Sequence, residues 1–187
     1  MNHAFSTHHL VDLELLIPSL VIDSKYATND NFTKKKVYTQ AKCYLIKDAK
    51  ASDELNNLGY TLKIWDAYRP LSVQYLFWSL VPDERYVANP HKGSRHNRGC
   101  AIDLTLVDRH GEEVAMGTEF DDFTQKAHRD FTSLPSHELD NRKILQSIME
   151  KNRFIGLETE WWHFDFEDWE NYPILDSTFD SLSDSQE

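Results

Sequence analysis

The chain contains little cysteine and no long apolar run. Its two cysteines are Cys43 and Cys100. Two are too few for a disulfide framework, and we expect both to be buried small side chains. No stretch approaches the ~18 consecutive apolar residues of a membrane span. The N-terminus also lacks the basic segment and uninterrupted apolar stretch that mark a secretory signal. These absences predict a cytoplasmic protein with no membrane partner.

Positive charge is also scarce. The chain has 20 Lys and Arg against 31 Asp and Glu, which gives a formal net charge of -11. A nucleic-acid-binding surface needs clustered Lys and Arg, so this balance argues against a nucleic-acid partner.

Length and composition are those of one globular domain. A chain of 187 residues predicts a single domain over 1–187, large enough to bury a core without disulfides or structural metals. Hydrophobic residues make up 40% and aromatic residues 12%, which excludes a disordered chain. Strand and helix patterns alternate without a regular β-α-β order. We therefore expect an α+β fold, an antiparallel sheet with flanking helices.

Hydrophobic periodicity and turn residues place the expected elements along the chain. They predict strands at 20–22, 61–65, 100–107 and 161–166, and helices at 41–58, 72–81 and 139–152. Residues 90–99 have the composition of a loop, and 109–112 that of a turn. The last residues, 176–187, are rich in Ser and Asp, and we expect a frayed acidic tail there.

Two separated segments carry candidate metal ligands. The first is Ser94-Arg95-His96-Asn97-Arg98-Gly99-Cys100-Ala101-Ile102-Asp103, and the second is Glu160-Trp161-Trp162-His163. Together they offer two histidines and an aspartate for a zinc ion, with Glu160 close to the last of them. Zinc with three protein ligands keeps a fourth position for water, and a nearby carboxylate can accept that water's proton. These residue types indicate metal-assisted hydrolysis.

Strand geometry places one requirement on this site. Alternation along 100–107 puts Asp103 on the face opposite Ile102 and Leu104, which should pack on the core. The same alternation would place Glu160 and His163 on opposite sides of the last strand. A shared site therefore requires a bend or bulge at Glu160. Taken singly, each candidate has an ordinary explanation as a loop, surface or core residue, and only their occurrence with further motifs favours a site.

Those further motifs make a family resemblance specific. In chain order, the matching stretches are Lys25 to Thr33, Trp65-Asp66-Ala67-Tyr68-Arg69-Pro70, Gly93 to Leu106, Met116 to Asp121, and Thr159 to Phe164. With them the chain resembles the VanX-type D-alanyl-D-alanine dipeptidases, which are zinc enzymes, from about Tyr26 to Phe166. The resemblance implies a hedgehog-like D,D-peptidase fold, one zinc ion per chain and a small dipeptide as the binding partner.

The resemblance also implies roles for single residues. His96, Asp103 and His163 match the zinc ligands of the family. Glu160 matches its catalytic base, and Arg69 matches the arginine that stabilises the tetrahedral intermediate. The residues that match the wall of the substrate cavity are Tyr26, Asp66, Phe77, Ser94 and Asp121, with Asp121 facing the substrate's amino group. Asp66 also stands three residues before Arg69, where it could form a structural ion pair with the guanidinium.

Two segments depart from the family pattern. The stretch between Pro70 and Ser94 is shorter than in the enzymes of vancomycin-resistance clusters, and Asn89 and Pro90 stand near the place of an expected tyrosine. This change leaves the preferred dipeptide open. Arg153 stands where relatives often carry a glycine, in a loop away from the chemistry.

Four hypotheses follow from the sequence. The leading one is a zinc D,D-dipeptidase. A D,D-carboxypeptidase acting on longer peptidoglycan stems would need an open cleft and, usually, export. A zinc-binding module without catalysis would require neither Glu160 nor Arg69, and the fourth possibility is a globular protein without a metal. The sequence predicts no oligomeric state.

Overall fold

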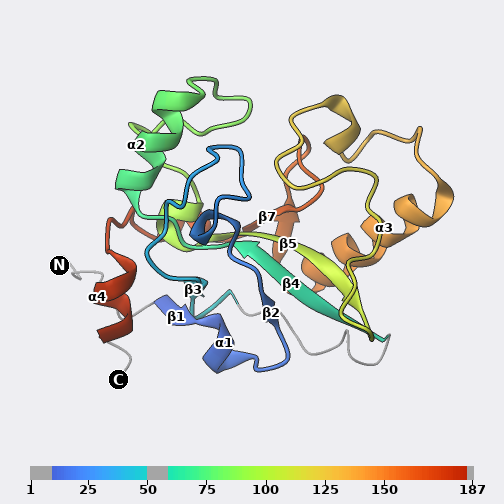
Figure 1. Cartoon of the computed structure of the whole chain (residues 1–187), viewed down its shortest axis with the longest axis horizontal. Helices are drawn as coiled ribbons and strands as arrows, with labels where there is room; N and C mark the ends of the chain where they lie inside the picture. Colours follow the sequence, from blue (N-terminus) through green and yellow to red (C-terminus); the bar gives the residue numbers. More distant parts are fainter. Residues whose placement is uncertain (1–9, 50–58, 185–187) are drawn as a thin grey trace.

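A mixed five-stranded sheet forms the centre of the computed structural model, which describes residues 10–49 and 59–184 (Figure 1). Its strand order is β2-β4-β5-β7-β6, and β1 and β3 form a separate two-stranded sheet. The strands are β1 (Leu10–Asp12), β2 (Val21–Ile22), β3 (Tyr44–Ile46), β4 (Tyr60–Asp66), β5 (Ala101–Asp108), β6 (Phe154–Gly156) and β7 (His163–Phe166).

The expected antiparallel sheet needs one correction. β4, β5, β7 and β6 pair antiparallel in that order, whereas β2 runs parallel to β4. A parallel pair needs a long crossover connection. Here the chain between β2 and β4 supplies it by way of β3 in the second sheet.

Four α-helices accompany the sheets among the described residues. They are α1 (Leu13–Leu16), α2 (Leu71–Leu80), α3 (Ser136–Lys151) and α4 (Phe179–Asp184). α2 and α3 begin directly after Pro70 and Pro135, whose fixed φ is tolerated at a helix start but not in its interior. Figure 1 places these two helices on opposite sides of the molecule, with the sheet between them. The predicted helices at 72–81 and 139–152 are thus confirmed with small shifts at their ends.

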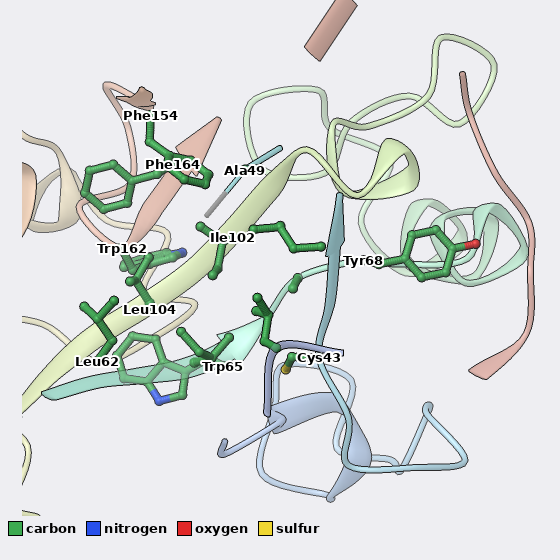
Figure 2. Close-up of a cluster of buried hydrophobic side chains, with 14 of the residues drawn as sticks. Cys43, Ala49, Leu62, Trp65, Tyr68, Ile102, Leu104, Phe154, Trp162 and Phe164 are labelled. Carbon is green, nitrogen blue, oxygen red and sulfur yellow. The ribbon is translucent and has the colours of Figure 1, made fainter. Parts of the chain in front are cut away.

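The core lies around β5, whose first seven residues are all buried. Cys100, Ile102, Leu104 and Leu106 are at most 1% exposed, as the alternation predicts. Figure 2 shows Ile102 and Leu104 among a cluster that includes Leu62, Trp162 and Phe164. Complete burial of an aliphatic or phenyl side chain of this kind stabilises the fold by roughly 1.5–3 kcal/mol.

The predicted helix at 41–58 is wrong over the part that the structure describes. Tyr44–Ile46 forms β3 instead, pairs antiparallel with β1 and is fully buried. A short apolar run fits a buried strand as well as a helix, and here the pairing with β1 decides between them. The rest of that prediction, residues 50–58, lies outside the described residues.

The expected frayed tail at 176–187 is also corrected. Residues 179–184 form α4, in which Phe179 and Leu182 are buried. The Phe179 ring lies 4.7 Å from that of Tyr38 and 5.8 Å from that of Tyr44, measured between centroids. These apolar contacts hold the segment although its composition is polar, and residues 185–187 lie outside the described part.

Two further expectations concern Cys43, Cys100 and the membrane. Both cysteines are free and buried, as predicted. Within 10–49 and 59–184, no helix is both long enough and apolar enough to cross a bilayer.

Candidate active site

Three elements bring the candidate metal ligands together. His96 begins a short 3-10 helix, His96–Arg98, while Asp103 lies in β5 and His163 begins β7. Asp103 and His163 are paired across the antiparallel β5–β7 ladder. All three side chains are buried, and one ligand atom of each lies within 4.8 Å of the others. The structure therefore brings together residues that are 67 positions apart in the sequence.

In each of the two histidines, one ring nitrogen faces away from the cluster and the other faces its centre. The hydrogen bond of the outer nitrogen determines whether the inner nitrogen carries a proton or a lone pair. His96 Nδ1 lies 2.6 Å from the carbonyl oxygen of Ala67, which can only accept, so Nδ1 carries the proton. His163 Nε2 lies 2.9 Å from a carboxylate oxygen of Asp165 and donates to it. In the neutral rings, His96 Nε2 and His163 Nδ1 then both present lone pairs to the centre of the cluster.

These inner atoms form a donor set that fits a metal ion. The two nitrogens face each other at 3.3 Å, and Asp103 Oδ1 lies 2.9 Å from His163 Nδ1. Two lone pairs and a carboxylate repel one another unless a positive charge lies among them. Burial alone would lower the pKa of His163, yet Asp165 and Asp103 hold it well above its usual value, so the cluster attracts positive charge. Two imidazoles and one carboxylate are ligands that zinc accepts, with outer partners of the kind seen here.

The chain bends at Glu160, as the shared site requires. The 157–163 turn, defined as residues 157 to 163, has backbone hydrogen bonds from Glu160 N to Leu157 O and from His163 N to Glu160 O, both of 3.4 Å. β7 therefore begins at His163 and not at Trp161, where the last strand was expected to start. The bend places Glu160 Oε2 3.8 Å from His163 Nδ1.

Burial gives the Glu160 carboxyl an altered acidity. Its side chain is 13% exposed, and burial raises its pKa to about 7, with Asp103 adding to the rise and His163 opposing it. A carboxyl with a pKa near neutrality can both accept and release a proton under ordinary conditions.

Arg69 enters the site from the segment after β4. Its backbone N–H donates to His96 O at 3.0 Å, and the side chain of Asn97 donates to Arg69 O at 2.8 Å. The guanidinium carbon lies 4.8 Å from the centroid of the Phe77 ring and 5.5 Å from that of Tyr26. Arg69 is thus tied to the segment that carries His96 and faces an aromatic wall.

Two side chains hold the guanidinium of Arg69. Asp66 accepts from Nη2 at 2.7 Å and from Nε at 3.2 Å. Gln74 accepts from Nη1 at 2.9 Å and donates its own amide to Ala88 O at 2.7 Å. Asp66, expected on the cavity wall, is not among the described residues that line the cavity. Asp66 is 1% exposed and forms an ion pair with the Arg69 guanidinium. This structural ion pair is the other role that its spacing had left open.

The candidate ligands, Glu160 and Arg69 share one cavity of about 320 Å³. This volume lies at the small end of the range of protein ligand sites. Four residues expected on its wall do line it: Tyr26, Phe77, Ser94 and Asp121. Asp121 accepts a hydrogen bond of 3.2 Å from the Tyr26 hydroxyl, and burial raises its pKa well above the usual value.

Sequence reasoning missed three aromatic residues of the cavity wall. Phe32, Tyr86 and Phe123 also line the cavity, and the rings of Tyr86 and Phe123 lie 4.9 Å apart. Tyr86 belongs to the stretch between Pro70 and Ser94. An aromatic residue in a polar loop was the available signal, but no spacing linked it to the other motifs.

Comparisons with known proteins identify the family of the chain. A D-Ala-D-Ala dipeptidase family model matches residues 6–182. The D-alanyl-D-alanine dipeptidase of Escherichia coli is 42% identical over 178 residues, which cover 92% of this chain and 92% of that protein. The proteins of that name from Enterococcus faecalis and Enterococcus faecium are 35% and 36% identical and cover 81% and 86% of this chain. These two alignments cover 87% and 92% of the respective relatives. The chain therefore belongs to the D-Ala-D-Ala dipeptidase family of peptidases.

Proposed function

We propose that this chain hydrolyses the D-alanyl-D-alanine dipeptide with the help of one zinc ion. One observation carries the proposal: Glu160, Arg69 and three converging metal-binding side chains line the same small cavity. The names of the relatives support the choice of dipeptide. The proposed partner is this small substrate, and neither a nucleic acid nor a membrane is required.

His96, Asp103 and His163 would hold the zinc ion. When bound, zinc supplies a Lewis acid that polarises a carbonyl and lowers the pKa of water. Asp165 and the carbonyl of Ala67 keep the two imidazole rings in the required tautomers. Histidine ligands of zinc commonly donate their other ring N–H to a carboxylate or carbonyl of this kind.

Glu160 is the proposed proton carrier. Its Oε2 is directed to the metal-binding cluster, so it can take a proton from the water that attacks the peptide carbonyl. With a pKa of about 7, the same carboxyl can then give that proton to the leaving amino group of the C-terminal residue.

Arg69 is the proposed stabiliser of negative charge. As water attacks, charge develops on the carbonyl oxygen, and a permanently cationic guanidinium at that oxygen stabilises the transition state more than the substrate. Asp66 and Gln74 fix the guanidinium in advance, so little reorganisation is needed during the reaction. Asp121, beside the Tyr26 hydroxyl, is the proposed partner of the substrate's ammonium group.

One assay tests the proposal. Release of free alanine is measured from D-Ala-D-Ala, from L-Ala-D-Ala and from a stem pentapeptide, each with and without a chelator. We expect cleavage of D-Ala-D-Ala that is lost with chelator and restored by zinc. Cleavage of the pentapeptide but not of the dipeptide would instead establish the carboxypeptidase alternative. Zinc binding without any cleavage would indicate a non-catalytic module.

A further inference from the structure

The 157–163 turn carries both Glu160 and His163, and its two ends are joined by a backbone hydrogen bond of 3.1 Å from Leu157 N to His163 O. The two backbone bonds that close it at Glu160 are both 3.4 Å long, near the upper limit for such a bond. The position of Glu160 relative to the metal-binding cluster depends on this backbone. The backbone around Glu160 therefore depends on contacts from outside the turn, and one of them is the hydrogen bond from Trp161 N to Ala127 O at 3.0 Å.

The guanidinium of Arg129 supplies such contacts. Its Nε donates to Leu157 O at 2.8 Å, and its Nη2 donates to Trp161 O and to His163 O, both at 2.9 Å. The three carbonyls lie on both sides of Glu160 in the sequence. The guanidinium carbon also lies 4.3 Å from the centroid of the Phe164 ring.

This arrangement needs an arginine. Three carbonyl oxygens that point to one place repel one another, and a planar cation with several fixed N–H donors can satisfy all of them together. A lysine ammonium is a compact point charge on a flexible stem and cannot reproduce the fork. The backbone of Arg129 adds one more bond to the turn, from its N–H to Glu158 O at 2.9 Å.

Gly156, the residue directly before the turn, makes room for this guanidinium. A Cβ atom at Gly156 would lie 2.4 Å from Arg129 Cζ and 2.5 Å from its Nε. Gly156 is not among the glycines with a positive φ, so alanine is allowed there by its backbone. The glycine is thus required by the approach of Arg129.

We propose that Arg129 is a positioning residue, which sets the bend of the 157–163 turn and so directs Glu160 and His163 to one centre. The kinetic consequence of this proposal rests on the proposed function. The structural part of the proposal, that Arg129 orders the turn, does not rest on it. Arg129 lies outside the cavity wall that the described residues form, so it acts through Glu160 and His163 and not on the substrate.

Arg142 offers a matched control. Its guanidinium also donates to three carbonyls, those of Met116, Lys126 and His128, at 2.6, 3.0 and 3.1 Å. None of these belongs to the 157–163 turn. Loss of either arginine removes a comparable set of hydrogen bonds, but of the two only Arg129 donates to carbonyls of the turn. Arg142 meets the turn through one ring contact, with its guanidinium carbon 5.7 Å from the centroid of Trp161.

The experiment compares Arg129→Met with Arg142→Met in the full chain. Hydrogen exchange is measured by mass spectrometry on peptides that cover 157–163 and 116–128, without metal. We expect Arg129→Met to speed exchange roughly tenfold or more at 157–163, and Arg142→Met to do so at 116–128. For D-Ala-D-Ala hydrolysis at saturating zinc, we expect kcat to fall on the order of 10²-fold in Arg129→Met, with KM nearly unchanged. In Arg142→Met, kcat should stay near the parent value. Zinc affinity, measured against a competing chelator, should fall about 10–100-fold in Arg129→Met alone.

Two milder variants keep the test decisive if Arg129→Met does not fold. Gly156→Ala keeps the arginine but displaces its guanidinium, and should shift exchange, zinc affinity and kcat in the same direction. Arg129→Lys keeps the charge and should recover only a small part of kcat.

Equal exchange at 157–163 in the Arg129 and Arg142 variants would overturn the proposal. A Gly156→Ala variant with faster hydrogen exchange at the turn but the kcat of the parent chain would overturn it too. If the parent chain releases no alanine at all, the proposed function fails, while the exchange and zinc-affinity measurements still decide the role of Arg129.

Discussion

The two walls of the cavity are built in different ways. The sheet wall consists of His96, Asp103 and His163, which lie in or beside the paired strands β5 and β7 and are at most 7% exposed. Glu160 and Arg69 belong with it, because their backbones are hydrogen-bonded to His163 and His96. The loop wall, which consists of Arg85, Tyr86, Ala88 and Phe123, comes from irregular segments after α2 and before α3. Groups that must hold a reacting geometry gain from a rigid scaffold, whereas loops tolerate change. We therefore expect the proposed reaction to depend on the sheet wall and substrate choice to depend on the loop wall.

Gln74 joins the two walls. It accepts from Arg69 and donates to Ala88 O in the loop wall. A substitution in one wall can therefore also affect the role expected of the other. Substitutions in each wall measure how far the two roles are separate.

The largest effect is expected on the sheet wall, from Glu160→Gln. This change removes the proton acceptor but keeps the shape, so kcat should fall by about 10²–10⁴-fold, with the zinc content unchanged. Alanine release and metal analysis of the purified variant give both values. Glu158→Gln, an exposed carboxylate in the same turn, is the control and should behave like the parent. Near-normal turnover in Glu160→Gln would exclude Glu160 as the base.

A second comparison places one arginine of each wall side by side. Arg69→Lys keeps the charge but cannot reach Asp66 and Gln74 together, so we expect kcat/KM to fall by about 10²-fold. Arg85 also lines the cavity but is exposed and pairs with Asp83, and Arg85→Lys should stay within about threefold of the parent. Steady-state kinetics on D-Ala-D-Ala decide the matter. Similar losses in the two variants would remove the distinction between the walls.

Tyr86→Ala should have a smaller effect and of a different kind. Loss of the ring that packs on Phe123 should raise KM for the dipeptide roughly tenfold, about 1.4 kcal/mol, and leave kcat almost unchanged. The ratio of kcat/KM between D-Ala-D-Ala and bulkier D,D-dipeptides should also shift. Tyr75→Ala, a 45% exposed tyrosine of α2 outside the cavity wall, is the control. A loss confined to kcat would contradict the role of the loop wall.

The smallest expected effect is on stability, through Asp121. Burial raises the pKa of its carboxyl, and Asp103 and Glu160 raise it further. A group with a raised folded pKa contributes stability below its unfolded pKa of ~3.9, and loses it as the pH rises towards the folded value. At pH 7 the raised pKa of the Asp121 carboxyl therefore destabilises the metal-free folded state relative to the unfolded chain, and Asp121→Asn should raise Tm by about 3 °C.

Thermal melts between pH 3.5 and 7 test this prediction. The gain from Asp121→Asn should vanish as the pH approaches 3.5, while the exposed Asp130→Asn should change little throughout. A gain that is the same at every pH would mean that the effect does not come from ionisation.

The sequence predicts the sheet wall well and the loop wall poorly. The strand from Ala101 to Asp108 and the placement of Asp103 away from the core both follow from alternation of side chains. The bend at Glu160 was predictable as a requirement, but its cause was not, because Arg129 lies outside every motif. Asp66 had two possible roles, and only the packing around Arg69 separates them.

Errors arose where tertiary contacts override local pattern. β3 is a strand because β1 pairs with it, and α4 is ordered because Phe179 packs on Tyr38. Arg153, expected where relatives often carry glycine, does adopt the left-handed φ of 68° that favours glycine. The hedgehog-like arrangement of the fold and the roles of single catalytic residues stay predictions.

The close approach of Arg129 to Gly156 has a consequence for how such sequences diverge. Because the arginine binds carbonyl oxygens, side chains of the 157–163 turn can change without loss of its hydrogen bonds. The glycine cannot change alone without displacing the guanidinium, since any Cβ there meets it. Across homologues, positions 129 and 156 should therefore vary together: a lineage that loses the arginine is released from the glycine, and one that keeps the arginine is bound to it.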